Sequence, residues 1–147
     1  MVSNPTADDI LRVRYRLNTV GDTTNVLSDD KITVFWREVV AEIEMECNVT
    51  FNTDNELHLA TAADGTAAMV LTDLIGRAFE ATSIELGDLR IDEQGLNWNV
   101  GVFQAAQNTL YRRYEHRKMM ITQLGYNVSN TGAKKIGIAY SLKRVGK

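Results

Sequence analysis

The most regular stretch of this 147-residue chain is Ala67-Ala-Met-Val-Leu-Thr-Asp-Leu-Ile-Gly-Arg-Ala-Phe79. Its apolar side chains recur every three or four residues, which is the period of an α-helix with one buried face. Many of them are small, so a second helix can approach closely. The period predicts a helix from after Asn55 to about Thr82, although Gly65 weakens its first third by about 1 kcal/mol relative to alanine. Its buried face comprises Ala67, Val70, Leu71, Leu74, Ile75, Ala78 and Phe79.

Three further helices are predicted around this one. A capping box of Thr6 and Asp9 starts a short helix, which a loop over 18–26 follows. Ser28 caps a second helix that ends near Asn48, and a polar connector over 49–55 precedes the long helix. A last helix runs from about Asn97 to Leu124, with Gly125 as its C-terminal cap. The predicted core includes Phe35, Trp36, Val39, Leu71, Leu74, Phe79, Val102 and Leu110.

Between the third and fourth helices the apolar period changes from 3.6 to 2. The run Ser83-Ile-Glu-Leu-Gly-Asp-Leu-Arg-Ile-Asp92 alternates apolar and polar residues around a Gly-Asp turn, which is typical of a type II′ hairpin. A lone hairpin is marginal in water, so we expect this one to serve contacts between subunits more than the core. The residues of this predicted contact are Ile84, Leu86, Gly87, Asp88, Leu89 and Ile91.

The predicted fold class is therefore mainly α: a bundle of about four helices with one inserted β-hairpin and an extended C-terminal tail. The bundle spans residues 1–125, and the tail spans residues 126–147. The tail contains three glycines, several β-forming residues and no acid, which favours an extended conformation that orders on binding.

Charge is strongly divided along the chain. Residues 112–147 carry nine Lys or Arg against the single acid Glu115, giving +8, whereas residues 1–111 carry seven basic and eighteen acidic residues, giving −11. This polarity indicates contacts with other macromolecules at two faces, against the simpler interpretation of a solvated basic tail. Because the tail is β-prone, we expect it to pair as a strand with a partner's sheet edge or to face DNA phosphates.

The composition excludes several classes of protein. Cys47 is the only cysteine, so no disulfide can form within the chain, and a reducing compartment is expected. No run approaches the roughly 20 apolar residues of a membrane span. His58 and His116 lie far from other metal-ligand residues, and no nucleophile motif is present. We therefore expect no enzyme activity, metal or cofactor.

Four segments together resemble a known family. They are Leu11-Arg-Val-Arg-Tyr-Arg-Leu17, the Gly-Asp loop at 21–22, Leu27-Ser-Asp-Asp-Lys-Ile32 and Ser83-Ile-Glu-Leu-Gly-Asp-Leu-Arg-Ile91. In order and spacing, residues 8–124 resemble the head-completion or head–tail connector (adaptor) proteins of tailed bacteriophages. Two features depart from that pattern: a lengthened loop over 18–22 and the tail after Gly125.

This resemblance implies a structural protein of the virion neck that is assembled in the host cytoplasm. It implies a dodecameric ring of copies docked under the portal protein, with DNA passing through its channel without sequence-specific contact. It also implies a stopper or tail protein bound below and no membrane. The tail residues expected to bind the portal are Lys134, Lys135, Ile136, Ile138, Tyr140, Leu142, Lys143 and Arg144.

Two alternatives to the adaptor remain open at this point. The first is a small, non-enzymatic DNA-binding accessory protein that uses the basic C-terminal end, although no helix-turn-helix pattern is present. The second is a small regulatory bundle that binds one protein partner. Rings or portal complexes would distinguish an adaptor from both.

Overall fold

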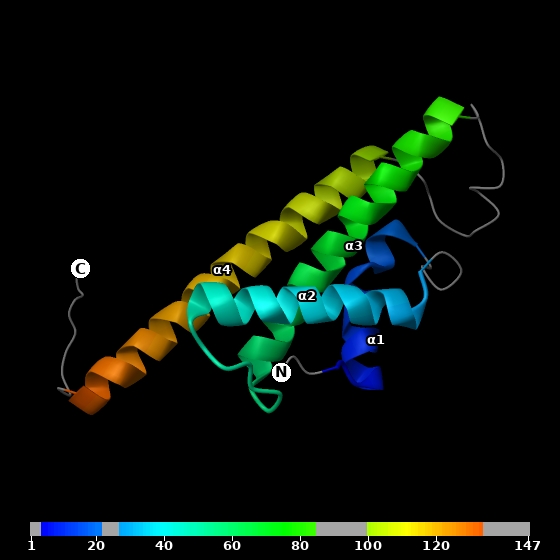
Figure 1. Cartoon of the computed structure of the whole chain (residues 1–147). Helices are drawn as coiled ribbons and strands as arrows, with labels where there is room; N and C mark the ends of the chain where they lie inside the picture. Colours follow the sequence, from blue (N-terminus) through cyan, green and yellow to red (C-terminus); the bar gives the residue numbers. More distant parts are fainter. Residues whose placement is uncertain (1–3, 22–26, 85–99, 134–147) are drawn as a thin grey trace.

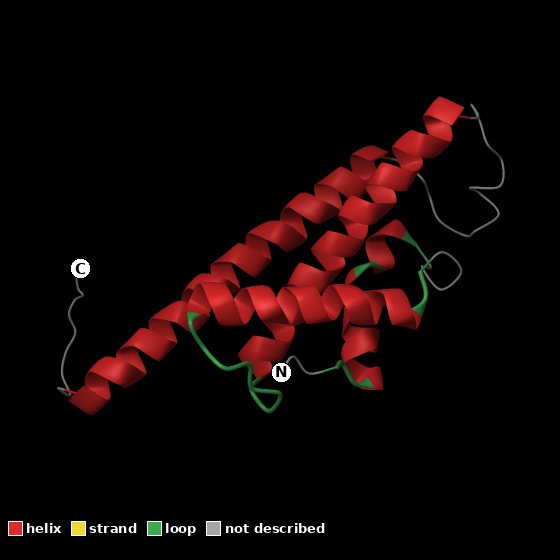
Figure 2. Ribbon diagram, viewed as in Figure 1, coloured by secondary structure: helices red, strands yellow, loops and turns green. Residues whose placement is uncertain are grey.

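A computed structural model describes residues 4–21, 27–84 and 100–133 of the chain. Within these ranges the protein is α-helical, as predicted, with four helices and one short 3₁₀ turn (Figures 1 and 2). The helices are α1 (Ala7–Arg16), α2 (Asp29–Cys47), α3 (Glu56–Ile84) and α4 (Val100–Ala133), and the turn η1 is Asn18–Val20.

Local hydrogen bonds set the first two helix starts where the sequence predicts them. The Thr6 hydroxyl accepts from the Asp9 amide at 3.2 Å, and the Asp9 carboxylate accepts from the Thr6 amide at 2.9 Å, which completes the capping box. The Ser28 hydroxyl accepts from the Lys31 amide at 3.1 Å and caps α2. At the other end, α2 stops at Asn48, whose left-handed conformation (φ 55°) terminates the helix.

The two long helices, α3 and α4, lie side by side and run in opposite directions, while α2 crosses α3 and α1 packs at one end (Figure 1). The core lies where these helices meet. Of the predicted core residues, Trp36, Val39, Leu71, Leu74 and Leu110 are buried, which confirms the helical register. Phe35 and Val102 are partly buried at its edge. The side chain of Phe79 lies outside the described set.

Two predicted boundaries are wrong. Ser83 and Ile84 belong to the last turn of α3, so the predicted first strand does not begin there; the helical pattern of α3 continues through these residues. The rest of that hairpin, with Leu86, Gly87, Asp88, Leu89 and Ile91, lies outside the described residues.

The second error concerns the end of α4. This helix continues past Gly125 to Ala133, so the first part of the predicted tail is helical. A glycine inside a helix costs only about 0.5–1 kcal/mol, and it ends the helix only when the chain turns there. The predicted portal-binding residues from Lys134 to Arg144 lie outside the described residues.

At Gly65, α3 lies very close to side chains of α2 and α4. A Cβ atom at this position would lie 2.6 Å from Cε1 of Tyr114 on α4 and 2.7 Å from Cγ1 of Val39 on α2. Both distances are shorter than any ordinary contact, so only glycine lets these side chains pack here. The sequence pattern marked this glycine as a weak point of the helix, but in the structure it is a packing site.

We therefore predict opposite effects for two glycine-to-alanine variants of the same helix. Gly65→Ala should lower the free energy of unfolding by about 1–3 kcal/mol, because the methyl group overpacks against Tyr114 and Val39. Gly76→Ala, whose Cβ would meet nothing within 4 Å, should raise it by about 0.5–1 kcal/mol. Denaturant unfolding of both variants measures the difference, and equal effects would contradict this packing.

His58 is a buried histidine in the first turn of α3. Its Nδ1 accepts a hydrogen bond from the Asn52 amide at 2.9 Å, and its ring lies 5.5 Å from that of Phe51, centroid to centroid. The acceptor role of Nδ1 requires the neutral imidazole. Burial lowers the pKa of His58 below its usual value, because the charged form would lose hydration.

This burial predicts a loss of stability on mild acidification. The unfolded chain takes up a proton at His58 near pH 6.5 and the folded chain resists it, so the free energy of unfolding should fall as pH drops below about 6.5. Denaturant unfolding at pH 7.5 and pH 5.5 measures this fall. The fall should shrink in His58→Gln and persist in His116→Gln, the exposed control. An unchanged fall in His58→Gln would exclude this histidine as its source.

Candidate functional site

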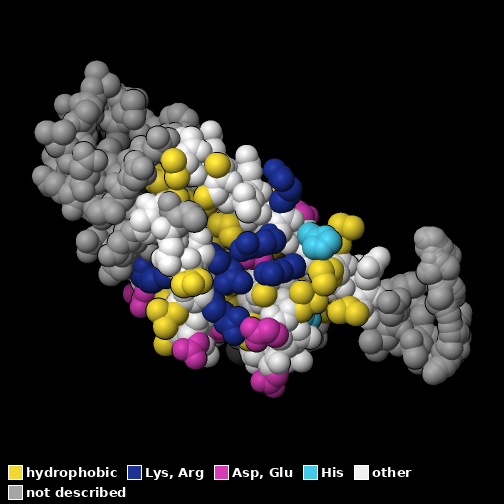
Figure 3. Space-filling model, turned by 180° about the vertical axis from the view of Figure 1, so that it is seen from behind, with side chains coloured by type: hydrophobic (Ala, Val, Ile, Leu, Met, Phe, Trp, Pro, Cys, Tyr) yellow, Lys and Arg dark blue, Asp and Glu magenta, His cyan; other side chains and the backbone are white. Residues whose placement is uncertain are grey.

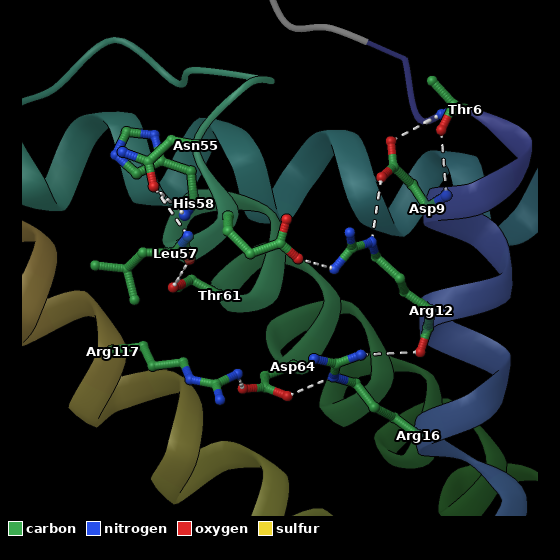
Figure 4. Close-up of polar contacts among 11 residues, drawn as sticks. Thr6, Asp9, Arg12, Arg16, Asn55, Leu57, His58, Thr61, Asp64 and Arg117 are labelled. Carbon is green, nitrogen blue, oxygen red and sulfur yellow. Dashed lines mark hydrogen bonds and ion pairs between the residues drawn. The ribbon is translucent and has the colours of Figure 1, made fainter.

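The carboxylate of Asp64 is the most heavily engaged polar group in the described part of the chain. Its side chain is completely buried on α3, and it binds arginines from two other helices (Figure 4). Arg16 Nε donates to Oδ1 at 2.6 Å, and Arg117 N–H donates to Oδ2 at 2.6 Å. Arg113 donates to both oxygens, at 2.9 Å and 3.5 Å. We call Arg16, Arg113, Arg117 and Asp64 the arginine cluster.

Helix geometry explains how these groups meet. Arg16 is the last residue of α1, while Arg113 and Arg117 are four residues apart on α4 and therefore share one face. On α3, Asp64 is surrounded by small buried residues that let both neighbouring helices approach the carboxylate. Those neighbours in the sequence are Ala62, Ala63, Gly65, Thr66, Ala67 and Ala68.

Three guanidinium groups against one carboxylate leave a surplus of positive charge. The side chains of Arg16, Arg117 and Arg113 are 17%, 29% and 45% exposed, so this charge reaches the surface. Lys and Arg side chains gather near the centre of the face seen from behind (Figure 3). Each guanidinium has five N–H donors, and each keeps some that no described residue accepts. The arrangement is therefore suited to bind an oxyanion such as a carboxylate or phosphate.

The neighbouring ion pair does not cancel this surplus. Arg12, whose carbonyl accepts from Arg16 at 3.2 Å, pairs with Glu56 at 2.6 Å and lies 3.9 Å from Asp9. The hydrogen bond between Arg12 and Glu56 raises the pKa of the guanidinium and lowers the pKa of the carboxyl. Because Arg12 and Glu56 neutralise each other, Glu56 contributes little negative charge to the arginine cluster.

A second ion cluster of opposite sign lies between α2 and α4. Lys118 Nζ binds Glu46 at 2.6 Å and Glu115 at 3.1 Å, and it sits 4.4 Å above the centre of the Tyr114 ring. The Tyr114 hydroxyl donates to Glu42. With three carboxylates around one ammonium, the group formed by Glu42, Glu46, Glu115 and Lys118 has surplus negative charge; we call it the carboxylate cluster.

The pKa values of this second cluster reflect its ion pairs. Burial favours neutral Lys118, but hydrogen bonds to Glu46 and Glu115 outweigh it and raise the lysine pKa. The bond from Lys118 lowers the pKa of Glu46. Burial, reinforced by the bond to Glu42, raises the pKa of the Tyr114 phenol, so this tyrosine stays a neutral donor.

These contacts change the interpretation of the basic C-terminal end. Arg113, Arg117 and Lys118 belong to that end, and all three hold α4 against the acidic body of the same chain. The sequence analysis missed Asp64 and Arg16 as partners. The only signal was a charged residue within an alanine-rich run that contains no other charge between Glu56 and Asp73.

The described residues contain no group of three His, Cys, Asp or Glu side chains that could hold a metal ion. Among the same residues, no helix is both long and apolar enough to cross a membrane. Comparisons with family models, curated proteins and solved structures were also made. None of them found a match for this chain.

The buried position of Asp64 predicts a large effect of removing its charge. Asp64→Asn should lower the free energy of unfolding by about 3 kcal/mol, because three arginines would face each other without a carboxylate. This value is the lower end of the range for broken buried ion pairs, since the arginines stay partly hydrated. Glu56→Gln, which breaks the exposed pair with Arg12, should cost much less, because water and salt screen that pair. Denaturant unfolding compares the two, and equal losses would contradict a structural role for Asp64.

Proposed function

We propose that this chain is a structural head-to-tail adaptor of a tailed phage. It forms a ring with copies of itself under the portal, extends the DNA channel and offers a platform for the next neck component. The proposal rests on the family resemblance of residues 8–124 and on how the segments that carry it are joined in the fold.

One contact supports the proposal above all others. Arg14, within the segment Leu11–Leu17, donates to the Leu27 carbonyl at 2.9 Å and to the Asp29 carboxylate at 2.6 Å. Both acceptors belong to the segment Leu27–Ile32, which also provides the Ser28 cap of α2. Two of the segments that resemble the adaptor family therefore form one structural unit, which supports reading them together.

The order of the helices is a second support. The resemblance implies a short helix, a loop, a helix that begins in a Ser-Asp sequence, a long alanine-rich helix, a strand and a final helix. The helices α1, α2, α3 and α4 follow this order. The fourth resembling segment carries that strand; its first residues, Ser83 and Ile84, are helical, and the rest lies outside the described residues.

The alternative of a DNA-binding accessory protein is less well supported. That function requires the basic end to be available to phosphate, but Lys118 is buried against Glu46 and Glu115, and Asp64 neutralises part of the charge of Arg113 and Arg117. The net charge of −3 also opposes the approach of DNA.

The proposed function predicts separate roles for the helices and the C-terminal residues. A chain ending at Ala133 keeps all four described helices, so it should melt within a few degrees of the full chain. It should nevertheless fail to bind the portal protein of the same phage in a pull-down. In the full chain, glutamine can replace Lys134, Lys135, Lys143 and Arg144. This change should weaken docking most at low salt, because the lost charges attract a partner most strongly when little salt screens them.

The control for this test is the full chain mixed with the same portal, which should form rings visible by negative-stain electron microscopy. Normal docking by the shortened chain would remove residues 134–147 from the mechanism. If the full chain itself neither forms rings nor binds the portal, the adaptor function is wrong.

A further inference from the structure

Two ion clusters of opposite surplus charge flank the same helix. The arginine cluster has three cations around Asp64, and the carboxylate cluster has three anions around Lys118. At about 100° per residue, Glu115 lies about 200° around α4 from Arg113 and about 160° from Arg117. Glu115, and with it the exposed part of the carboxylate cluster, therefore faces a different side of α4 from the two arginines.

We propose that the arginine cluster of one copy binds the carboxylate cluster of the next copy. The outward N–H donors of Arg113 and Arg117 would bind carboxylates of the partner, foremost the half-exposed Glu46 and Glu115. Guanidinium groups bind carboxylates in a paired, directional way, so the contact sets orientation as well as attraction. That the copies close into a ring rests on the proposed function. The pairing of the two clusters rests on their charges alone.

The position of the clusters determines the kind of assembly. Because the two surfaces differ in charge and face different sides of α4, each copy offers one surface of each kind. Such a contact is head-to-tail, and it repeats from copy to copy until a ring closes or a filament grows. A two-fold dimer would satisfy both surfaces at once only if they lay side by side on one face.

A second copy fits the arginine cluster better than nucleic acid does. Residues 1–111 carry −11, so a DNA phosphate that approaches the arginines also meets the acidic body. A second copy has the same acidic body, but its carboxylate cluster is held in place by the fold and offers carboxylates that can bind the guanidinium groups directly. Two surpluses of opposite sign in one chain are also explained together by self-assembly, whereas DNA binding explains only one.

Charge reversal tests this pairing. Arg113→Glu leaves Asp64 with Arg16 and Arg117, and Glu46→Lys leaves Lys118 with Glu115, so both variants should fold. Each should lower the association constant by about tenfold or more at low salt, because like charges then meet in the contact. The double variant should recover to within about threefold, since the charges are exchanged but again opposite.

Matched controls lie on the outer face of α2. Arg37→Glu and Glu38→Lys make the same charge changes at exposed positions outside both clusters, and they should leave association unchanged within about twofold. Sedimentation velocity at about 50 mM and about 500 mM salt measures association, which should weaken at the higher salt. Circular dichroism melts verify folding, and Arg113→Gln replaces Arg113→Glu if the latter is unfolded.

Several results would overturn the pairing. One is an association constant that is unchanged in both single variants. Another is a double variant whose association constant is as low as those of the single variants. A third is a native chain that stays monomeric. A native chain that shifts DNA through Arg113 without self-association would assign the cluster to nucleic acid instead.

Failure of the pairing and failure of the adaptor function give different results. If Arg113→Glu still forms rings on the portal, the pairing is wrong and the adaptor function stands. If the clusters control self-association but no copy binds the portal, the adaptor function is wrong and the pairing stands.

Discussion

The ion cluster around Asp64 is the constraint on which the rest of the structure depends. A fully buried carboxylate is costly unless its oxygens are satisfied by charged donors, and here α1 and α4 supply them. If either helix moved, it would withdraw arginine donors and leave buried charge uncompensated. The carboxylate therefore fixes α1 and α4 against α3 in a way that the apolar contacts of the small surrounding residues cannot.

The same stretch of α4 is held from two sides. Arg113 and Arg117 bind Asp64 and hold α4 against α3. The residues that directly follow them, Tyr114 and Lys118, bind glutamates of α2 and hold α4 against that helix. Gly65 lets the Tyr114 ring approach α3 closely enough for both sets of contacts to form. The same residues consequently provide both stability and surface charge. In each cluster three charges surround one central group of opposite charge, Asp64 or Lys118, which cannot neutralise all three.

The sequence predicts the helices and most of the core, because both depend on short-range patterns. Caps such as Thr6 and Ser28 need only neighbouring amides, and the spacing that buries Trp36 or Leu74 repeats within one helix. The candidate site was not predictable in this way. Arg16 and Asp64 are 48 residues apart, and their pairing depends on how α1 docks on α3, which no local pattern encodes.

The two wrong boundaries have a related cause. At Gly125 and at Ile84, the local pattern favoured a break or a strand, yet α4 and α3 continue as helices through these positions. A local preference of about 1 kcal/mol does not outweigh the hydrogen bonding of a long helix that is already formed.

A double-mutant cycle between Arg16 and Asp64 tests the central claim, that this carboxylate joins the helices, most directly. The free energies of unfolding of Arg16→Gln, Asp64→Asn and the double variant give the coupling between the two side chains. The account predicts a coupling of about 1–3 kcal/mol, well above that of the exposed Arg12–Glu56 pair. A coupling below about 0.5 kcal/mol would show that α1 is held in place without Asp64, and would contradict the account.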